Sequence, residues 1–140
     1  MLDHPISSCP TWLASPNHHC QVISPGRSGT RWLANILTEV SNAFVCHATP
    51  KTLAEPGYLL DKGTISREEA LGAYRNSRGT FLRLSEHANR HFIDLDCKVT
   101  PLAGVLSEAY KKCGFLLMLR NPLAFVKSGI TRGYFLDKEP

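Results

Sequence analysis

A β-branched run, a glycine-containing turn and an amphipathic stretch follow one another between residues 21 and 40. The run 21–24 ends at Pro25-Gly26, and the apolar residues of 30–40 recur at the i, i+3/i+4 spacing of one helical face. We therefore predict a strand, a turn and a helix. In that order they form the first half of a β-α-β unit, which places the chain among folds with parallel strands.

Strand and helix patterns continue to alternate along the chain. The further strands that we predict cover 43–46, 80–85 and 115–119. The further helices cover 66–76, 101–113 and 123–132, and a loop with prolines and a glycine covers 47–63. The run 115–119 is apolar at every residue, as expected for a strand buried on both faces of a parallel sheet. The alternation predicts a doubly wound, mostly parallel α/β sheet.

The composition is that of one globular domain. The chain has 140 residues, of which 43% are hydrophobic and 20% charged, enough apolar content to build a core. Its net charge of +4 is modest and not gathered in long runs, which favours a small anionic ligand over nucleic acid. Residues 1–19 contain three prolines and no apolar period, so we expect an irregular leader before a domain at 20–140.

Hydropathy and the number and spacing of the cysteines indicate in which cellular compartment the chain is expected. No apolar run approaches the roughly 18–20 residues of a membrane span, and no basic region leads into an apolar run at the N-terminus. We expect neither a span nor a signal peptide. The five cysteines include no CxxC pair, which favours a reducing, cytoplasmic compartment. His18-His19-Cys20 cannot close a tetrahedral site alone, so we expect no metal.

The segment from Ser24 to Trp32 lies between the first predicted strand and the N-terminus of the first predicted helix. Unpaired backbone N–H groups converge there and favour an anion. The segment combines backbone freedom, hydroxyl donors and positive charge in Gly26, Gly29, Ser28, Thr30, Arg27 and Arg31. The Walker A spacing and its lysine are absent. The segment predicts a phosphate or sulfate site; the alternative is an ordinary turn rich in small residues.

A second constellation follows the last predicted strand. Arg120 lies at the carboxyl end of that strand, the edge where open α/β sheets bind ligands. Ser128 comes eight residues later, about two helical turns on, and Arg132 is one turn further on the same face. A guanidinium with a hydroxyl suits a phosphate monoester. The alternative is an arginine that only caps carbonyls at the strand end.

Taken together, the two segments resemble the sulfotransferase family. The loop from Gly26 to Leu33 resembles that family's 5′-phosphosulfate loop, and Arg120-Asn121-Pro122 through Ser128-Gly129 resembles its 3′-phosphate motif. The resemblance covers roughly 21–135 and implies a P-loop-like fold of which this chain carries the N-terminal part. The family's glycine- and basic-rich C-terminal segment has no counterpart here, so we expect a truncated domain. We also expect an uncovered sheet edge that invites self-association.

The resemblance implies 3′-phosphoadenosine 5′-phosphosulfate (PAPS) as the cofactor and a hydroxyl compound of unknown class as the acceptor. Residues 26–31 would hold the phosphosulfate end, and Arg120, Ser128 and Arg132 the 3′-phosphate. Arg27 would stabilise charge on the bridging oxygen without donating a proton. The base that takes the acceptor's proton could be one of three residues, His47, Glu55 or Glu86.

Two other functions fit the same residues less fully. One is a small nucleotide-dependent kinase, against which the missing Walker lysine counts. The other is a non-catalytic module that binds an anion or a nucleotide, which the short chain favours.

Overall fold

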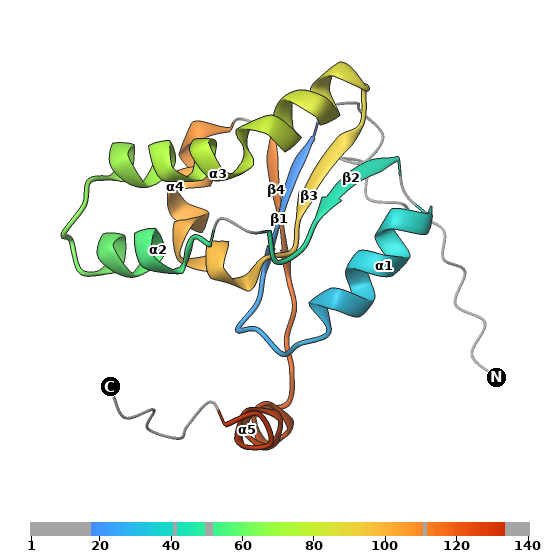
Figure 1. Cartoon of the computed structure of the whole chain (residues 1–140), viewed down its shortest axis with the longest axis vertical. Helices are drawn as coiled ribbons and strands as arrows, with labels where there is room; N and C mark the ends of the chain where they lie inside the picture. Colours follow the sequence, from blue (N-terminus) through green and yellow to red (C-terminus); the bar gives the residue numbers. More distant parts are fainter. Residues whose placement is uncertain (1–17, 41, 50–51, 111, 134–140) are drawn as a thin grey trace.

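The structure, a computed structural model, describes residues 18–40, 42–49, 52–110 and 112–133 (Figure 1). Its centre is a sheet of four parallel strands in the order β2-β3-β1-β4. The strands are β1 (His19–Ile23), β2 (Ala43–Cys46), β3 (His91–Asp94) and β4 (Cys113–Leu117). In the register, His19 lies opposite Phe92 on one side and Cys113 on the other. The predicted α/β class with a parallel sheet is confirmed.

Helices cover both faces of the sheet. They are α1 (Thr30–Val40), α2 (Ala54–Asp61), α3 (Arg67–His87), the 3-10 helix η2 (Cys97–Leu102), α4 (Ala103–Ala109) and α5 (Pro122–Ile130). Figure 1 shows α1 on one face and α2, α3 and α4 on the other. Each face has its own apolar core, one around Val22 and Ile93 against α1, the other around Tyr74, Leu102 and Leu106. The strands β1 and β3 separate the two cores.

The longest helix corrects two predictions. Helix α3 begins at Arg67, directly after the predicted cap Ser66, which forms a reciprocal capping box with Glu69. It runs on to His87 and not to about residue 76. The predicted strand at 80–85 is therefore wrong. The third strand in chain order is β3, which is not among the predicted strands. All four residues of β3 are buried, although the strand begins with His91 and ends with Asp94, both polar. It lies inside the sheet, between β2 and β1.

The prediction that the last strand is buried on both faces is wrong. The strand β4 lies at the edge of the sheet, and Phe115, Leu116 and Leu117 are exposed. Among the described residues no strand pairs with its outer side. The edge is therefore uncovered in this part of the chain, while self-association and truncation stay predictions.

Smaller differences concern the ends of elements. The predicted loop at 47–63 contains α2, and the predicted helix at 101–113 is divided into η2 and the short α4. The predicted leader, residues 1–19, lies outside the described residues except for His18 and His19, and His19 already belongs to β1. Helices 30–40 and 123–132 match α1 and α5 closely. None of the described helices has the length and apolar character that crossing a bilayer requires.

Candidate functional site

The loop between β1 and α1 has the backbone conformation that its glycines allow. Gly26 and Gly29 have φ angles of +80° and +92°, and Arg27 between them has φ +51°. A Cβ atom at Gly26 would lie 3.3 Å from Sγ of Cys97, so a larger residue there would require the Cys97 side chain to shift slightly. A non-glycine residue in the left-handed region costs about 1–2 kcal/mol. Such positions are typical of functional sites, and here Arg27 is the residue held in one.

The first residue of this loop, Ser24, is hydrogen-bonded to η2, whereas the backbone N–H groups further along the loop have no acceptor among the described residues. Thr100 Oγ1 donates to the carbonyl of Ser24 at 3.1 Å and accepts from its N–H at 3.2 Å. Ser24 Oγ accepts from the N–H of Gly26 at 3.1 Å and contacts Ser28 Oγ. No described group accepts from the N–H of Arg27, Ser28 or Gly29. Three backbone donors are thus available next to the N-terminus of α1.

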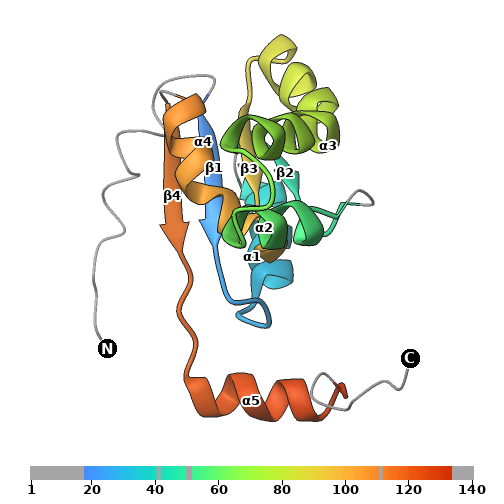
Figure 2. The same cartoon turned by 90° about the vertical axis from the view of Figure 1, so that its left-hand side faces the viewer.

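The glycine-containing loop after β1 and the segment from Arg120 to Ser128 are far apart in the sequence but are hydrogen-bonded to each other at Arg27. Arg120 Nη1 donates a hydrogen bond to the carbonyl of Arg27. The side chain of Arg27 in turn donates from Nε to Oγ of Ser128, in α5, at 3.2 Å. Figures 1 and 2 show why this is possible, since α5 lies beyond the end of the sheet, on the side of the β1–α1 loop. Both guanidinium groups therefore lie at the carboxyl ends of the strands, where this class of sheet binds its ligands.

Four arginines face one crevice with a volume of about 590 Å³. They are Arg27 and Arg31 from the loop and α1, and Arg120 and Arg132 from the second motif. The remaining lining residues are Gly29, Thr30, Trp32, Asn35 and His47, so no carboxylate of the described residues lines the crevice. A concave surface with four positive charges and no negative one concentrates anions. Of the predicted cofactor residues, Gly26 lines an adjoining cavity instead, and Ser28 and Ser128 line neither.

His47 is the one candidate base that lies at this crevice. It follows β2, and its Nε2 is 3.1 Å from Oγ1 of Thr30. It lines both the arginine crevice and the adjoining cavity of about 400 Å³. Glu55 is exposed in the first turn of α2 and lines neither. Glu86 lies near the end of α3 and lines a cavity with His18 and Lys112, at the opposite ends of the strands.

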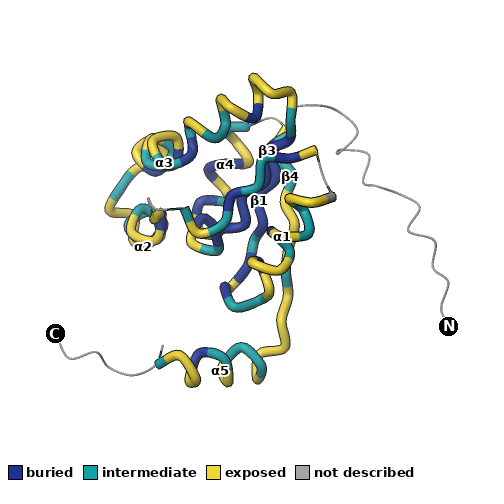
Figure 3. The backbone as a smooth tube through the Cα atoms, turned by 45° about the vertical axis from the view of Figure 1, so that its right-hand side comes forward, coloured by how far each residue is buried: buried dark blue, intermediate teal, exposed yellow. Residues whose placement is uncertain are grey.

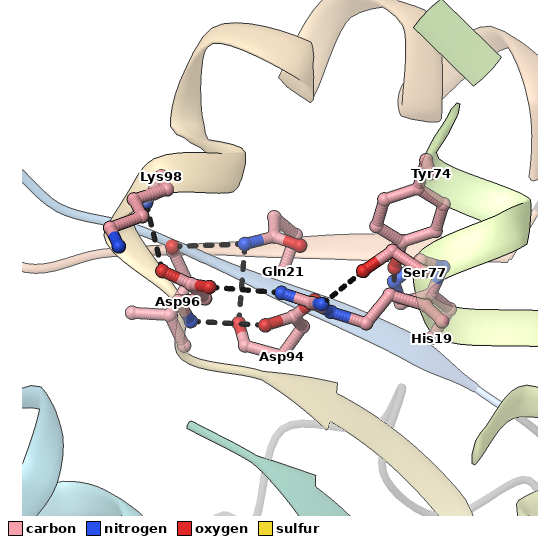
Figure 4. Close-up of polar contacts among 9 residues, drawn as sticks. His19, Gln21, Tyr74, Ser77, Asp94, Asp96 and Lys98 are labelled. Carbon is pink, nitrogen blue, oxygen red and sulfur yellow. Dashed lines mark hydrogen bonds and ion pairs between the residues drawn. The ribbon is translucent and has the colours of Figure 1, made fainter. Parts of the chain in front are cut away.

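Behind the loop lies a buried ionic network that is not among the predicted features (Figure 4). Arg78, in the middle of α3, is 0% exposed. Its Nε is 2.7 Å from Oδ2 of Asp94, and its Nη2 is 3.0 Å from Oδ2 of Asp96. The second oxygens accept backbone hydrogen bonds, Asp94 Oδ1 from the N–H of Asp96 and Asp96 Oδ1 from that of Lys98. Burial raises the pKa of Asp94, although Arg78 acts to lower it.

A sequence signal for this network exists. Ala70, Tyr74 and Arg78 recur every four residues, so Arg78 lies on the buried stripe of α3, and all three are buried. An arginine in a buried stripe needs a carboxylate partner. The apolar run around Asp94 and Asp96 offers two of them. Both carboxylates are thus paired with Arg78, and among the described residues no group of three or more His, Cys, Asp or Glu is placed to hold a metal ion.

Comparisons of the chain with protein-family models, with curated proteins and with solved structures found no match. The functional argument therefore depends on the geometry of the site and on its chemistry.

Proposed function

We propose that the chain binds PAPS and transfers its sulfuryl group to a hydroxyl acceptor. The observation that supports this most directly is the pair of hydrogen bonds that joins Arg120 and Ser128 to Arg27. These residues belong to two motifs that the sulfotransferase resemblance assigns to opposite ends of one nucleotide. A site for such a nucleotide requires both motifs at one crevice, and the arginine-lined crevice contains residues of both.

The residues at the crevice fit an anionic ligand. The N–H groups of Arg27, Ser28 and Gly29 have no described acceptor, and the phosphosulfate oxygens would supply acceptors for them. Arg120 and Arg132 both line the crevice and would hold the 3′-phosphate through charge-assisted hydrogen bonds. Ser128 Oγ now accepts from Arg27, so in the bound state this bond would be replaced by bonds from both groups to the nucleotide.

In the reaction, the acceptor oxygen forms a bond to sulfur while the bond from sulfur to the bridging phosphate oxygen breaks. His47 takes the acceptor's proton, and the leaving 3′-phosphoadenosine 5′-phosphate keeps the electron pair. Arg27 stabilises the charge that develops on the leaving oxygen by electrostatics and hydrogen bonding. The contact of His47 with Thr30 places the imidazole at the loop that would hold the sulfuryl group.

Calorimetry with 3′-phosphoadenosine 5′-phosphate and with ATP tests the binding step. We expect the bisphosphate to bind about tenfold or more tightly than ATP, and equally well in magnesium and in EDTA, because Asp94 and Asp96 are both paired with Arg78. Arg120→Ala should weaken binding by about tenfold or more. Arg83→Ala, at an exposed arginine of α3, is the matched control and should bind as the unaltered chain does. Preference for Mg·ATP would favour a kinase and refute the proposal.

A transfer assay tests the chemical step. The chain is incubated with PAPS and a panel of phenols, sugars, lipids with a free hydroxyl, and tyrosine peptides, and release of the bisphosphate is followed. We expect transfer to at least one class, lost in His47→Ala. Tight binding without transfer to any acceptor would instead identify a non-catalytic nucleotide-binding module.

A further inference from the structure

We infer that Thr100 is a positioning residue that holds the glycine loop, residues 24–29 between β1 and α1, in its anion-binding conformation. We also infer that the buried Arg78–Asp96 pair fixes the start of η2, the helix that contains Thr100. No motif of the sulfotransferase resemblance includes any of these three residues. The part of the inference that concerns ligand affinity rests on the proposed function, whereas the part that concerns the loop conformation does not.

Thr100 controls the first residue of the loop. Its Oγ1 contacts both backbone groups of Ser24, donating to the carbonyl and accepting from the N–H. Ser24 is 2% exposed, so water cannot replace these bonds and each is more costly to lose than at the surface. Because Ser24 Oγ in turn accepts from the N–H of Gly26, the orientation fixed at Ser24 is passed to the first glycine.

The helix η2, which contains Thr100, is itself fixed from two directions. Val99 and Leu102, on either side of Thr100, are fully buried in the core under α3. At its start, Asp96 caps η2 by accepting from the N–H of Lys98 at 3.1 Å. The other oxygen of that carboxylate is held by Arg78 at 3.0 Å. The chain of contacts therefore runs from α3 through Arg78 and Asp96 into η2, and from Thr100 to the loop.

This support matters because of the donors it aligns. The N–H groups of Arg27, Ser28 and Gly29 lie in the part of the loop that begins at Ser24, and none has a described acceptor. A loop that is ordered before the ligand arrives loses less conformational entropy on binding. Preorganised backbone donors also need no reorganisation when charge develops during a reaction. Removal of the Thr100 hydroxyl should therefore loosen the loop and weaken anion binding without disturbing the sheet.

Three threonine variants test the inference. Thr100→Val removes the hydroxyl at nearly constant volume, and Thr100→Ser keeps it. Thr38→Val is the matched control, since Thr38 Oγ1 bonds to the carbonyl of Ala34 within α1. Amide hydrogen exchange is measured without ligand, and binding of 3′-phosphoadenosine 5′-phosphate by calorimetry. In Thr100→Val we expect the N–H groups of Ser24 and Gly26 to exchange about tenfold faster, and affinity to fall about fivefold or more. Thr100→Ser and Thr38→Val should match the unaltered chain.

The outcomes separate the two proposals. If the unaltered chain does not bind the bisphosphate, the proposed function fails, while exchange at Ser24 and Gly26 still decides whether Thr100 positions the loop. Unchanged exchange there in Thr100→Val overturns the positioning role. Faster exchange that extends equally to Val22 and Ile93 also overturns it, because the hydroxyl would then support the whole sheet. Faster loop exchange with unchanged affinity, in a chain that binds, overturns the link between loop order and binding.

Discussion

The region behind the glycine loop buries charged side chains, whereas the region of β4 and α5 exposes apolar ones. Behind the glycine loop, charged residues are buried: Arg78 and Asp94 are 0% exposed and Asp96 is 5% exposed. At β4 and α5, large apolar residues are exposed, among them Leu117, Leu119, Leu123 and Ile130. Figure 3 shows the difference in burial along the backbone, dark blue in β1 and β3 and yellow in the chain that leads from β4 to α5.

The difference shows that burial follows the neighbours of a residue and not its hydrophobicity alone. Arg78 is buried because helix α3 packs over the sheet and two carboxylates satisfy its guanidinium. Leu119 and Leu123 are exposed because α5 and the chain that leads to it have no extensive packing with the described helices and strands. The loop end of the site is thus held by a satisfied polar network. The α5 end is joined to it through the hydrogen bonds at Arg27.

The sharpest test of this contrast removes the buried charge. Arg78→Met leaves Asp94 and Asp96 buried without their cation, and such a loss costs about 3–5 kcal/mol. Arg83→Met, in the same helix but exposed, should change the free energy of unfolding by less than about 0.5 kcal/mol. Urea denaturation measures both. Equal stabilities of the two variants would mean that the ionic network contributes nothing that a surface arginine does not.

Two leucines compare the packed and unpacked regions directly. Leu106, in α4, is 0% exposed and Leu123, in α5, is 79% exposed. Leu106→Ala should cost about 2–5 kcal/mol, because it leaves a cavity in the core, whereas Leu123→Ala should cost less than about 0.5 kcal/mol. Thermal and urea unfolding give the comparison. A large cost at Leu123 would show that another molecule, or another copy of the chain, covers α5 in solution.

His19 makes the stability of the buried region depend on pH. Burial lowers the pKa of His19 from 6.5 to about 4, while its Nε2 lies 2.8 Å from the hydroxyl of Tyr74. As pH falls, the imidazole of His19 takes up its proton in the unfolded chain before it does so in the folded chain. The free energy of unfolding is therefore highest above pH 6.5 and falls by about 3 kcal/mol toward pH 4. Urea unfolding across this range measures the slope. In His19→Gln the slope should be smaller; an unchanged slope would assign the proton uptake to other groups.

At Arg27 we expect a small change in stability together with a large change in binding. Glycine relieves the positive φ of Arg27, which costs about 1–2 kcal/mol, but adds chain entropy worth roughly 0.5–1 kcal/mol. Arg27→Gly should therefore stay within about 1 kcal/mol of the unaltered chain while binding of the bisphosphate falls about tenfold or more. Asn89→Gly, at a similar φ of +53° after α3, is the control and should leave binding unchanged. Equal binding by both variants would remove Arg27 from the site.

The local elements of the site were predictable because their signals are local. The helical period of 30–40, the glycines around Arg27 and the proline after Arg120 each act on their own backbone, and the structure has the helix and the positive φ angles where they indicate. The prediction failed at 80–85, where Phe81, Leu82 and Leu84 suit a strand as well as a helix. There Leu82 packs against the core under α3 and Ser85 is buried, so the helical face continues through the segment.

The sequence by itself determined that parallel strands alternate with helices, that a glycine loop precedes α1 and that an arginine follows β4, because propensity, period and turn chemistry act within a few residues. Only the tertiary structure decided that β4 lies at an edge, that Arg78 is buried against two carboxylates and that Arg27 joins the two motifs. These are pairings between distant segments. They depend on strand order and on which faces are covered, and a pattern read along the chain contains neither.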